Sequence, residues 1–197
     1  MLVTLILIGS GLAFAVAKSG VLEVPLFSMW YQGPQPARLV TPVALDQAGL
    51  NALIAQRLQQ QAEQHAAPYT VNVTESELSG DVLSQAKAAL QAKGWSIENL
   101  QVAILPSGLQ AYGRLVKAPW HVDFLLNFQA SVSNGVLHFT ISHVQVGDYP
   151  LPTSFAIQSL SSFFGQDLST WSIDLGSAGL RDVQLHDGSL DLILNGV

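Results

Sequence analysis

The sequence contains no cysteine, and among its 197 residues only eight are Lys or Arg. The absence of cysteine excludes disulfides, thiolate catalysis and cysteine-based metal sites. The formal net charge is −6, so the chain has no basic stripe that could replace the counterions of a nucleic acid. Nucleic-acid binding is therefore excluded, and electrostatic adhesion to anionic lipid headgroups is disfavoured.

Charge of either sign is scarce. Charged residues make up 11% of the chain, well below the roughly 25% of an ordinary soluble domain, whereas apolar residues reach 49%. The bias extends to residues 120–197, which are rich in Leu, Val, Ile and Phe. Such a chain either hides much apolar surface or presents some of it to a partner or to lipid.

Residues 1–24 predict a signal peptide or a membrane anchor. The uncharged run Leu2–Ala17 would span roughly 24 Å as a helix, less than the ~30 Å hydrocarbon core. Its last three residues, Ala-Val-Ala, have the form of a signal-peptidase site, but no Lys or Arg precedes the run. We expect an extracytoplasmic domain in the cell envelope, either membrane-anchored or secreted. A buried N-terminal helix or strand is the alternative.

The remainder divides into a spacer and one domain. Residues 25–40 are rich in Pro and Gly and cannot hold a long helix, so the domain is expected over residues 41–197. Helical periodicity predicts two amphipathic helices between residues 45 and 94, with Asp46 as an N-cap for the first. Thr74 and Glu77 form a capping box for the second.

From residue 96 onward the hydrophobic period is 2, which predicts strands; residues 153–165 form a third helix. The segment GDYPLP before this helix is expected to be a loop. The predicted fold class is α+β: a curved, mostly antiparallel β-sheet of long hairpins packed against two or three amphipathic helices, preceded by an N-terminal apolar helix.

Residues 121–146 predict one long hairpin turning at Asn134-Gly135, a pair typical of a type I′ turn. That turn fixes the register and places Phe128 opposite Ile141 on an apolar face, while the other face is mixed polar.

Beyond residue 141 the apolar residues change parity, to Val144 and Val146. A β-bulge near Ser142-His143 would return them to the apolar face and turn His143 outward. The alternatives are a buried, hydrogen-bonded histidine or a histidine with a chemical role.

Candidate chemistry is sparse. His121 and Asp123 share one strand face, and Asp148 lies near His121 in the predicted register, but the pattern lacks a third metal ligand with defined spacing. Asp123 is expected as an outward, solvated strand position. No nucleophile elbow, Walker loop, dinucleotide fingerprint or H-E-x-x-H motif is present. The sequence therefore predicts no enzyme, no cofactor and no metal, with an envelope hydrolase at these three residues as the weakest alternative.

Four segments occur in a distinctive order: VNVTESELSGDVL, ENLQVAILPSGLQAYGRL, VSNGVLHFTISHVQVGDYPLPTSF and VQLHDGSLDLILNG. Together they resemble the LmeA phospholipid-binding family of bacterial envelope proteins and, more distantly, the YpmS family, over about residues 45–196. The chain departs from the family pattern at Ser79, where Asn is expected. The resemblance implies a membrane-associated, non-catalytic domain that binds or shields phospholipid acyl chains.

If so, the ligand contacts would come from the apolar hairpin face and from the helix that covers it. The candidate ligand-binding residues are Leu126, Phe128, Phe139, Ile141, Phe155, Ile157, Leu160 and Phe164. Each of them serves equally well as ordinary core. A solid-core extracytoplasmic module that docks a protein partner through its polar sheet face or an edge strand is the second hypothesis.

Overall fold

The protein is described from a computed structural model. It covers residue 14 and residues 18–21, 31–64, 68–164, 170–174 and 179–195. The expected N-terminal apolar helix lies almost wholly outside these residues. In the described part, no helix is long and apolar enough to cross a membrane.

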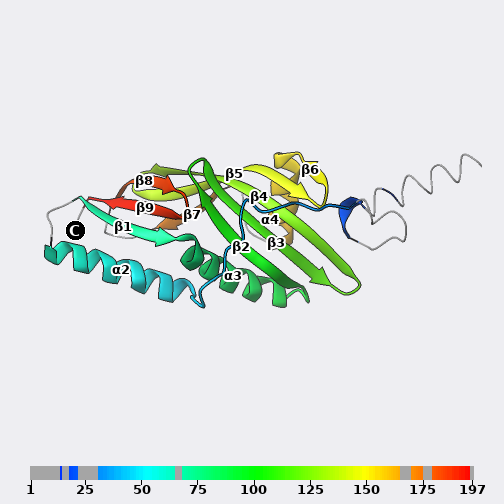
Figure 1. The fold of residues 1–197 in the computed structure, drawn as a ribbon, viewed down its shortest axis with the longest axis horizontal. Helices are drawn as coiled ribbons and strands as arrows, with labels where there is room; N and C mark the ends of the chain where they lie inside the picture. Colours follow the sequence, from blue (N-terminus) through cyan, green and yellow to red (C-terminus); the bar gives the residue numbers. More distant parts are fainter. Residues whose placement is uncertain are drawn as a thin grey trace, which may run out of the picture.

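Figure 1 shows an elongated molecule in which helices pack against antiparallel sheets. This arrangement confirms the predicted α+β fold class. The elements in the described residues are α2 (Gln47–Gln64), β1 (Tyr69–Thr74), α3 (Glu75–Gln91), β2 (Ser96–Leu105), β3 (Gly108–Lys117), β4 (Trp120–Ser133), β5 (Val136–Val146), β6 (Tyr149–Leu151), α4 (Thr153–Phe164), β7 (Thr170–Asp174), β8 (Leu180–His186) and β9 (Ser189–Leu194).

The strands form two sheets with antiparallel pairing throughout. A three-stranded sheet has the order β1-β9-β8, and a larger sheet has the order β2-β3-β4-β5-β6, with β7 also paired to β5. The prediction of a loop before α4 is thus wrong in part. Tyr149–Leu151 forms the short strand β6, because Val144 and Val146 extend β5 far enough to pair with it.

Local sequence signals account for the element boundaries. Asp46 accepts a hydrogen bond from the amide of Gly49 at 2.8 Å, and Thr74 and Glu77 close the predicted capping box at the start of α3. At the β4–β5 turn Asn134 has φ 53° and Gly135 has φ 76°, the two positive angles that a type I′ turn requires.

The main core lies where the two sheets meet. It joins α2 and the start of α3 to one face of β2, β3 and β5 and to β1, β8 and β9, with partly buried residues of β4 packed against it. Two smaller clusters extend the same face: one beneath the second half of α3, and one where Ala156 of α4 packs on Ile141 and Val144 of β5.

Side chains occupy the outer backbone groups of two edge strands. On β1, Gln61 of α2 exchanges two hydrogen bonds with the backbone of Thr70, at 2.6 and 2.7 Å. On β2, the Ser79 hydroxyl accepts from the Val102 amide at 2.7 Å and donates to its carbonyl at 3.1 Å. Exposed strand edges invite pairing with other chains, and these contacts leave less of both edges free.

Residues 31–42, the strap, cross the face of β2, β3 and β4 opposite α4 (Figure 1). The amide of Ala37 donates to Gln110, and the amide of Val40 donates to Gln101, whose side chain donates in turn to the Arg38 carbonyl. Much of the predicted spacer is therefore hydrogen-bonded to the sheet.

Candidate functional site

The predicted register of the β4–β5 hairpin is confirmed. Ala130 pairs with Phe139 and Phe128 pairs with Ile141, while Leu126 pairs with Val144. Because paired residues of antiparallel strands share a side of the sheet, these residues line one face, called here the apolar face.

The predicted bulge is confirmed as well. The register shifts between Asn127 and Phe128, so that Asn127 pairs with His143 and Ser142 is the extra residue of β5. The Ser142 hydroxyl donates to the Asn127 carbonyl at 3.2 Å. Val144 is thereby buried on the apolar face, and His143 sits half-buried on the polar face, so its position is explained by strand geometry alone.

Two of the eight candidate ligand-binding residues are buried core. Phe139 is 1% exposed and lies in the cluster shared by the two sheets, and Ile141 is 7% exposed beneath α4. Neither side chain offers surface to a ligand without a rearrangement of its neighbours.

Four others are at least partly open. Leu126 and Phe128 on β4 and Ile157 on α4 are half-buried, and Phe155 on α4 is 58% exposed. The last two candidates, Leu160 and Phe164, lie in α4, but their side chains are outside the described part of the structure.

The central strand β4 carries a partly buried apolar row that packs against the core clusters, here the β4 stripe: Phe124, Leu126, Phe128, Ala130 and Val132. The strands on either side are better covered. Leu109 and Ala111 of β3 and Leu137, Phe139, Ile141 and Val144 of β5 are all buried.

The surroundings of the β4 stripe carry little charge. Helix α4 has no charged residue, and the Asp, Glu, Lys and Arg content of β4 and β5 is limited to Asp123, which points to the opposite face. Within α4, Ala156 is buried, whereas Ser154, Phe155 and Gln158 are exposed. Among the described side chains of α4, Ala156 and Ile157 pack on the sheet.

On the opposite, polar face, Asp123 is 3% exposed, which corrects its expected solvated position. The Arg114 guanidinium donates to both carboxylate oxygens, at 2.7 and 3.0 Å, and the Tyr31 hydroxyl donates at 2.7 Å. Burial raises the pKa of Asp123, but these hydrogen bonds outweigh burial and hold it below its usual value. Burial and the bond to Asp123 raise the pKa of Tyr31.

The other two residues of the candidate hydrolase site have separate partners. Asp148 accepts from the Gly33 amide at 2.8 Å, and the amide of His121 donates to the Val21 carbonyl at 3.3 Å. Among the described residues no group of three or more His, Asp or Glu side chains is placed to hold a metal. The contacts of Asp123 and Asp148 attach the strap to the sheet.

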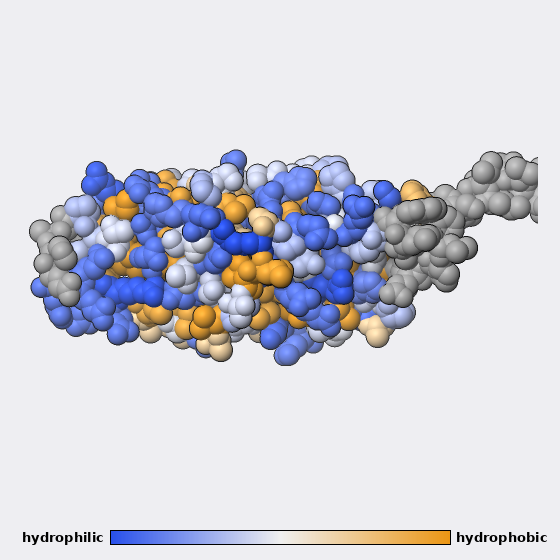
Figure 2. Space-filling model, viewed as in Figure 1, coloured by the Kyte–Doolittle hydropathy of each residue, from blue (hydrophilic) through white to orange (hydrophobic). Residues whose placement is uncertain are grey.

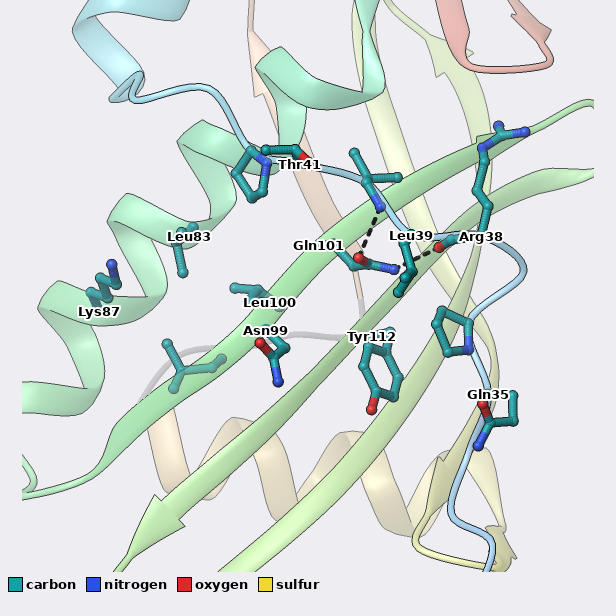
Figure 3. Close-up of a pocket in the computed structure, with 14 residues that line it drawn as sticks. Gln35, Arg38, Leu39, Thr41, Leu83, Lys87, Asn99, Leu100, Gln101 and Tyr112 are labelled. Carbon is teal, nitrogen blue, oxygen red and sulfur yellow. Dashed lines mark hydrogen bonds between the residues drawn. The ribbon is translucent and has the colours of Figure 1, made fainter.

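A concavity lies between the strap, α3 and the edge strand β2 (Figure 3). This strap groove has a volume of about 750 Å³. Leu83 and Lys87 of α3 lie on one side, the strap on the other, and Tyr112 points into the space between them. At its rim Leu39 is 85% exposed, and Figure 2 shows apolar surface gathered near the middle of this face.

Sequence reasoning missed the strap groove, because it treats the strap as a spacer. The available sequence signal is Asn99, a residue type that adopts positive φ more readily than most. In the structure Asn99 has φ 53°, lies at the register shift of β2 between Glu98 and Gln101, and lines the groove.

A scan against protein-family models, a search of curated proteins and a search of solved structures found no match to this chain. The resemblance to the LmeA family therefore stays a prediction from the sequence motifs.

Proposed function

We propose that the protein binds an acyl chain of a phospholipid along the β4 stripe, beside α4, without catalysing a reaction on it. The observation that carries the proposal is the apolar surface along β4 and α4: the β4 stripe packs against the core but is only partly buried, and Phe155 of α4 is 58% exposed.

The chemistry of the stripe suits an acyl chain. Phe124 and Phe128 are four residues apart, about 14 Å along a strand, and the residues between them on this face are apolar. Each methylene removed from water there contributes about 0.8 kcal/mol. The lack of charge on α4 and on this face of β4 and β5 means that no ionic group must be desolvated.

The proposal is of a binding protein rather than an enzyme. Asp123, the most promising acid in the sequence, has both oxygens bound to Arg114 and a further hydrogen bond from Tyr31. A general base needs a free lone pair aimed at a substrate proton, and this carboxylate faces the strap instead. We propose an extracytoplasmic location in the cell envelope, with the segment before residue 18 as membrane anchor or cleaved leader.

The test uses the full chain in membranes of cells fed a fatty acid that carries a photoactivatable diazirine. After irradiation, the crosslinked peptides of the purified protein are located by mass spectrometry. The proposal expects crosslinks within β4 and α4. Crosslinks confined to residues 1–17, with none in β4 or α4, would contradict it.

The strap groove favours a second candidate function, docking of a protein partner through an apolar side chain. Its support is the exposed Leu39 above a groove of about 750 Å³. Two sets of contacts reduce the surface available to a partner. The strap already covers part of the polar face, and side chains bind outer backbone groups of the edge strands β1 and β2. Loss of a crosslinked protein partner on Leu39→Ser, but not on Phe155→Ser, would support this second function.

A further inference from the structure

The turns β3–β4 and β5–β6 lie at one end of the larger sheet, and residues 18–21 lie between them (Figure 1). The amide of Asp148, in the β5–β6 turn, donates to the Lys18 carbonyl at 3.0 Å. The amide of His121, at the start of β4, donates to the Val21 carbonyl at 3.3 Å. The N-terminal segment is thus bound to the sheet at this end, beyond the point where β5 stops pairing with β4.

Gly147 allows residues 18–21 to lie close to the sheet. Gly147 has φ +56°, and a Cβ on it would lie 2.3 Å from the Ser19 carbonyl oxygen. Any side chain at position 147 would therefore push residues 18–21 away from the sheet.

Two large aromatic residues are exposed at the same end. Trp120 is 46% exposed and Tyr149 is 37% exposed. Tyr149 pairs with Val146, which pairs with Phe124, and Trp120 is four residues before Phe124 on the same strand. Both aromatic side chains therefore belong to the side of the sheet that carries the β4 stripe.

Trp and Tyr are enriched at membrane–water interfaces, because an apolar ring with one polar group suits the headgroup level. Beside Trp120, an apolar hollow of about 430 Å³ is lined by Val21, Trp95, Lys117 and Val122, among others. The charges here do not oppose a membrane: Lys117 lies over the Trp95 ring at 5.6 Å, and the nearby acid Asp148 is engaged by the Gly33 amide.

The position of the uncharged run Leu2–Ala17 in the sequence indicates a lipid bilayer as the partner of this surface. This run joins directly to Lys18, which is held between the two turns. If the run lies in a bilayer, the chain connects it to the domain through one residue, so this end must be within a few ångströms of the lipid surface.

We propose that this end of the domain docks on the bilayer surface, with Trp120 and Tyr149 at the level of the lipid headgroups. The inference rests on the proposed membrane attachment but not on acyl-chain binding by the β4 stripe. The contact is apolar, so it persists at high salt and needs no anionic lipid. In this orientation α2 and the three-stranded sheet are the parts farthest from the membrane (Figure 1).

The lack of cysteine makes a direct test simple, because a single introduced thiol can be labelled specifically. The variants Trp120→Cys, Tyr149→Cys and Gln60→Cys, each in the full chain, are labelled with an environment-sensitive fluorophore and reconstituted into phosphatidylcholine vesicles. Gln60 is exposed on α2 and serves as the matched distal control. Ser10→Cys reports whether the N-terminal run itself is in the membrane.

The proposal expects a blue shift of emission, and quenching by lipids brominated near the headgroup, at positions 120 and 149 but not at position 60. Quenching at position 10 with none at 120 and 149 would overturn docking while keeping the attachment. Equal quenching at position 60, or shielding of 120 and 149 from both water and lipid quenchers, would overturn it too, the latter in favour of a protein partner. Should Trp120→Cys fail to fold, loss of brominated-lipid quenching of the intrinsic fluorescence in Trp120→Phe provides the same test.

Both results are separable from the acyl-chain proposal. Docking is measured at positions 120 and 149, whereas acyl-chain binding is measured by crosslinks in β4 and α4, and either can fail alone.

Discussion

The two faces of the larger sheet are covered in different ways. On the polar face the strap is held by directional hydrogen bonds: its backbone amides donate to Gln101 and Gln110, and its Tyr31 hydroxyl donates to Asp123. On the apolar face the cover is mainly apolar packing, and it buries most apolar side chains of β3 and β5 more completely than those of the β4 stripe. The first face holds one fixed segment. Packing on the second face is not directional, which is why we propose that face for an apolar ligand of variable shape.

The largest loss of stability is expected at Phe139, which is buried in the core on the apolar face. Phe139→Ala removes a ring that is 1% exposed, and we expect a loss of about 3–5 kcal/mol in the free energy of unfolding. Urea unfolding followed by circular dichroism measures it. A loss below about 1 kcal/mol would mean that Phe139 lines a cavity, and that the core assignment is wrong.

The polar face is tested by Arg114→Ala, which leaves the buried Asp123 carboxylate with Tyr31 as its remaining side-chain partner. We expect a loss of about 3 kcal/mol at neutral pH. His186→Ala, which breaks the more exposed pair with Asp191, is the control and should cost less than about 0.5 kcal/mol.

The pH dependence of this loss follows from the lowered pKa of Asp123. A carboxyl whose pKa is lowered by folding stabilises the folded state above its ordinary pKa, and this contribution is lost as the pH falls through the lowered value. The difference between wild type and Arg114→Ala should therefore be largest at neutral pH and shrink below about pH 4. A difference that stays constant down to pH 3 would show that Arg114 acts by packing rather than by charge.

A smaller effect is expected at Ser79. Ser79 is fully buried, and its hydroxyl serves both the amide and the carbonyl of Val102. Ser79→Ala would leave both groups without that partner, at a cost of about 2 kcal/mol. Ser79→Thr keeps the hydroxyl and is the matched control, judged by hydrogen exchange of the Val102 amide. Equal exchange rates in Ser79→Ala and the wild type would contradict the capping role.

Asp81 is the exception to the well-partnered polar groups of the domain. It is 2% exposed, its Oδ1 has no hydrogen-bond partner among the described residues, and burial raises its pKa. Raised by folding, such a carboxyl favours the folded state below its ordinary pKa, and this stability is lost as the pH rises through the raised value. Asp81→Asn, which keeps an acceptor for Gln85, should stabilise the protein by about 1 kcal/mol at neutral pH.

That gain should disappear below about pH 3, where the wild-type carboxyl is protonated in both states. Thermal unfolding at the two pH values measures it. Destabilisation by Asp81→Asn at neutral pH would indicate that the charged carboxylate has a partner in the working protein.

The sequence predicted features that depend on neighbours in the chain. The Asn134-Gly135 turn fixes the hairpin register, the change of parity after residue 141 locates the bulge, and the capping box locates the start of α3. Each signal is contained within a few residues, so no knowledge of the tertiary fold is needed.

Features that depend on distant contacts were missed. The strap reads as a spacer, because its partners Gln101 and Gln110 follow it by more than sixty residues. The burial of Asp123 was predictable in part: Arg114 lies opposite it across the β3–β4 turn, a register the sequence reasoning did not work out. Which apolar residues of the hairpin are buried and which are exposed depends on the elements that cover them. The alternation of residues along a strand does not contain that information.

The smallest change in stability, and the sharpest difference in function, is expected between two exposed apolar side chains on opposite faces. Phe155 on α4 is 58% exposed and Leu39 on the strap is 85% exposed, so replacing either by Ser should alter the unfolding free energy by less than about 0.5 kcal/mol. Their roles differ: Phe155 lies on the uncharged helix beside the β4 stripe, whereas Leu39 borders the strap groove. Phe155→Ser should therefore reduce photocrosslinking of the fatty acid to β4 and α4 several-fold, while Leu39→Ser leaves it unchanged. Equal crosslinking in both variants would remove Phe155 from the binding surface, and a loss with Leu39→Ser alone would move the lipid to the strap face.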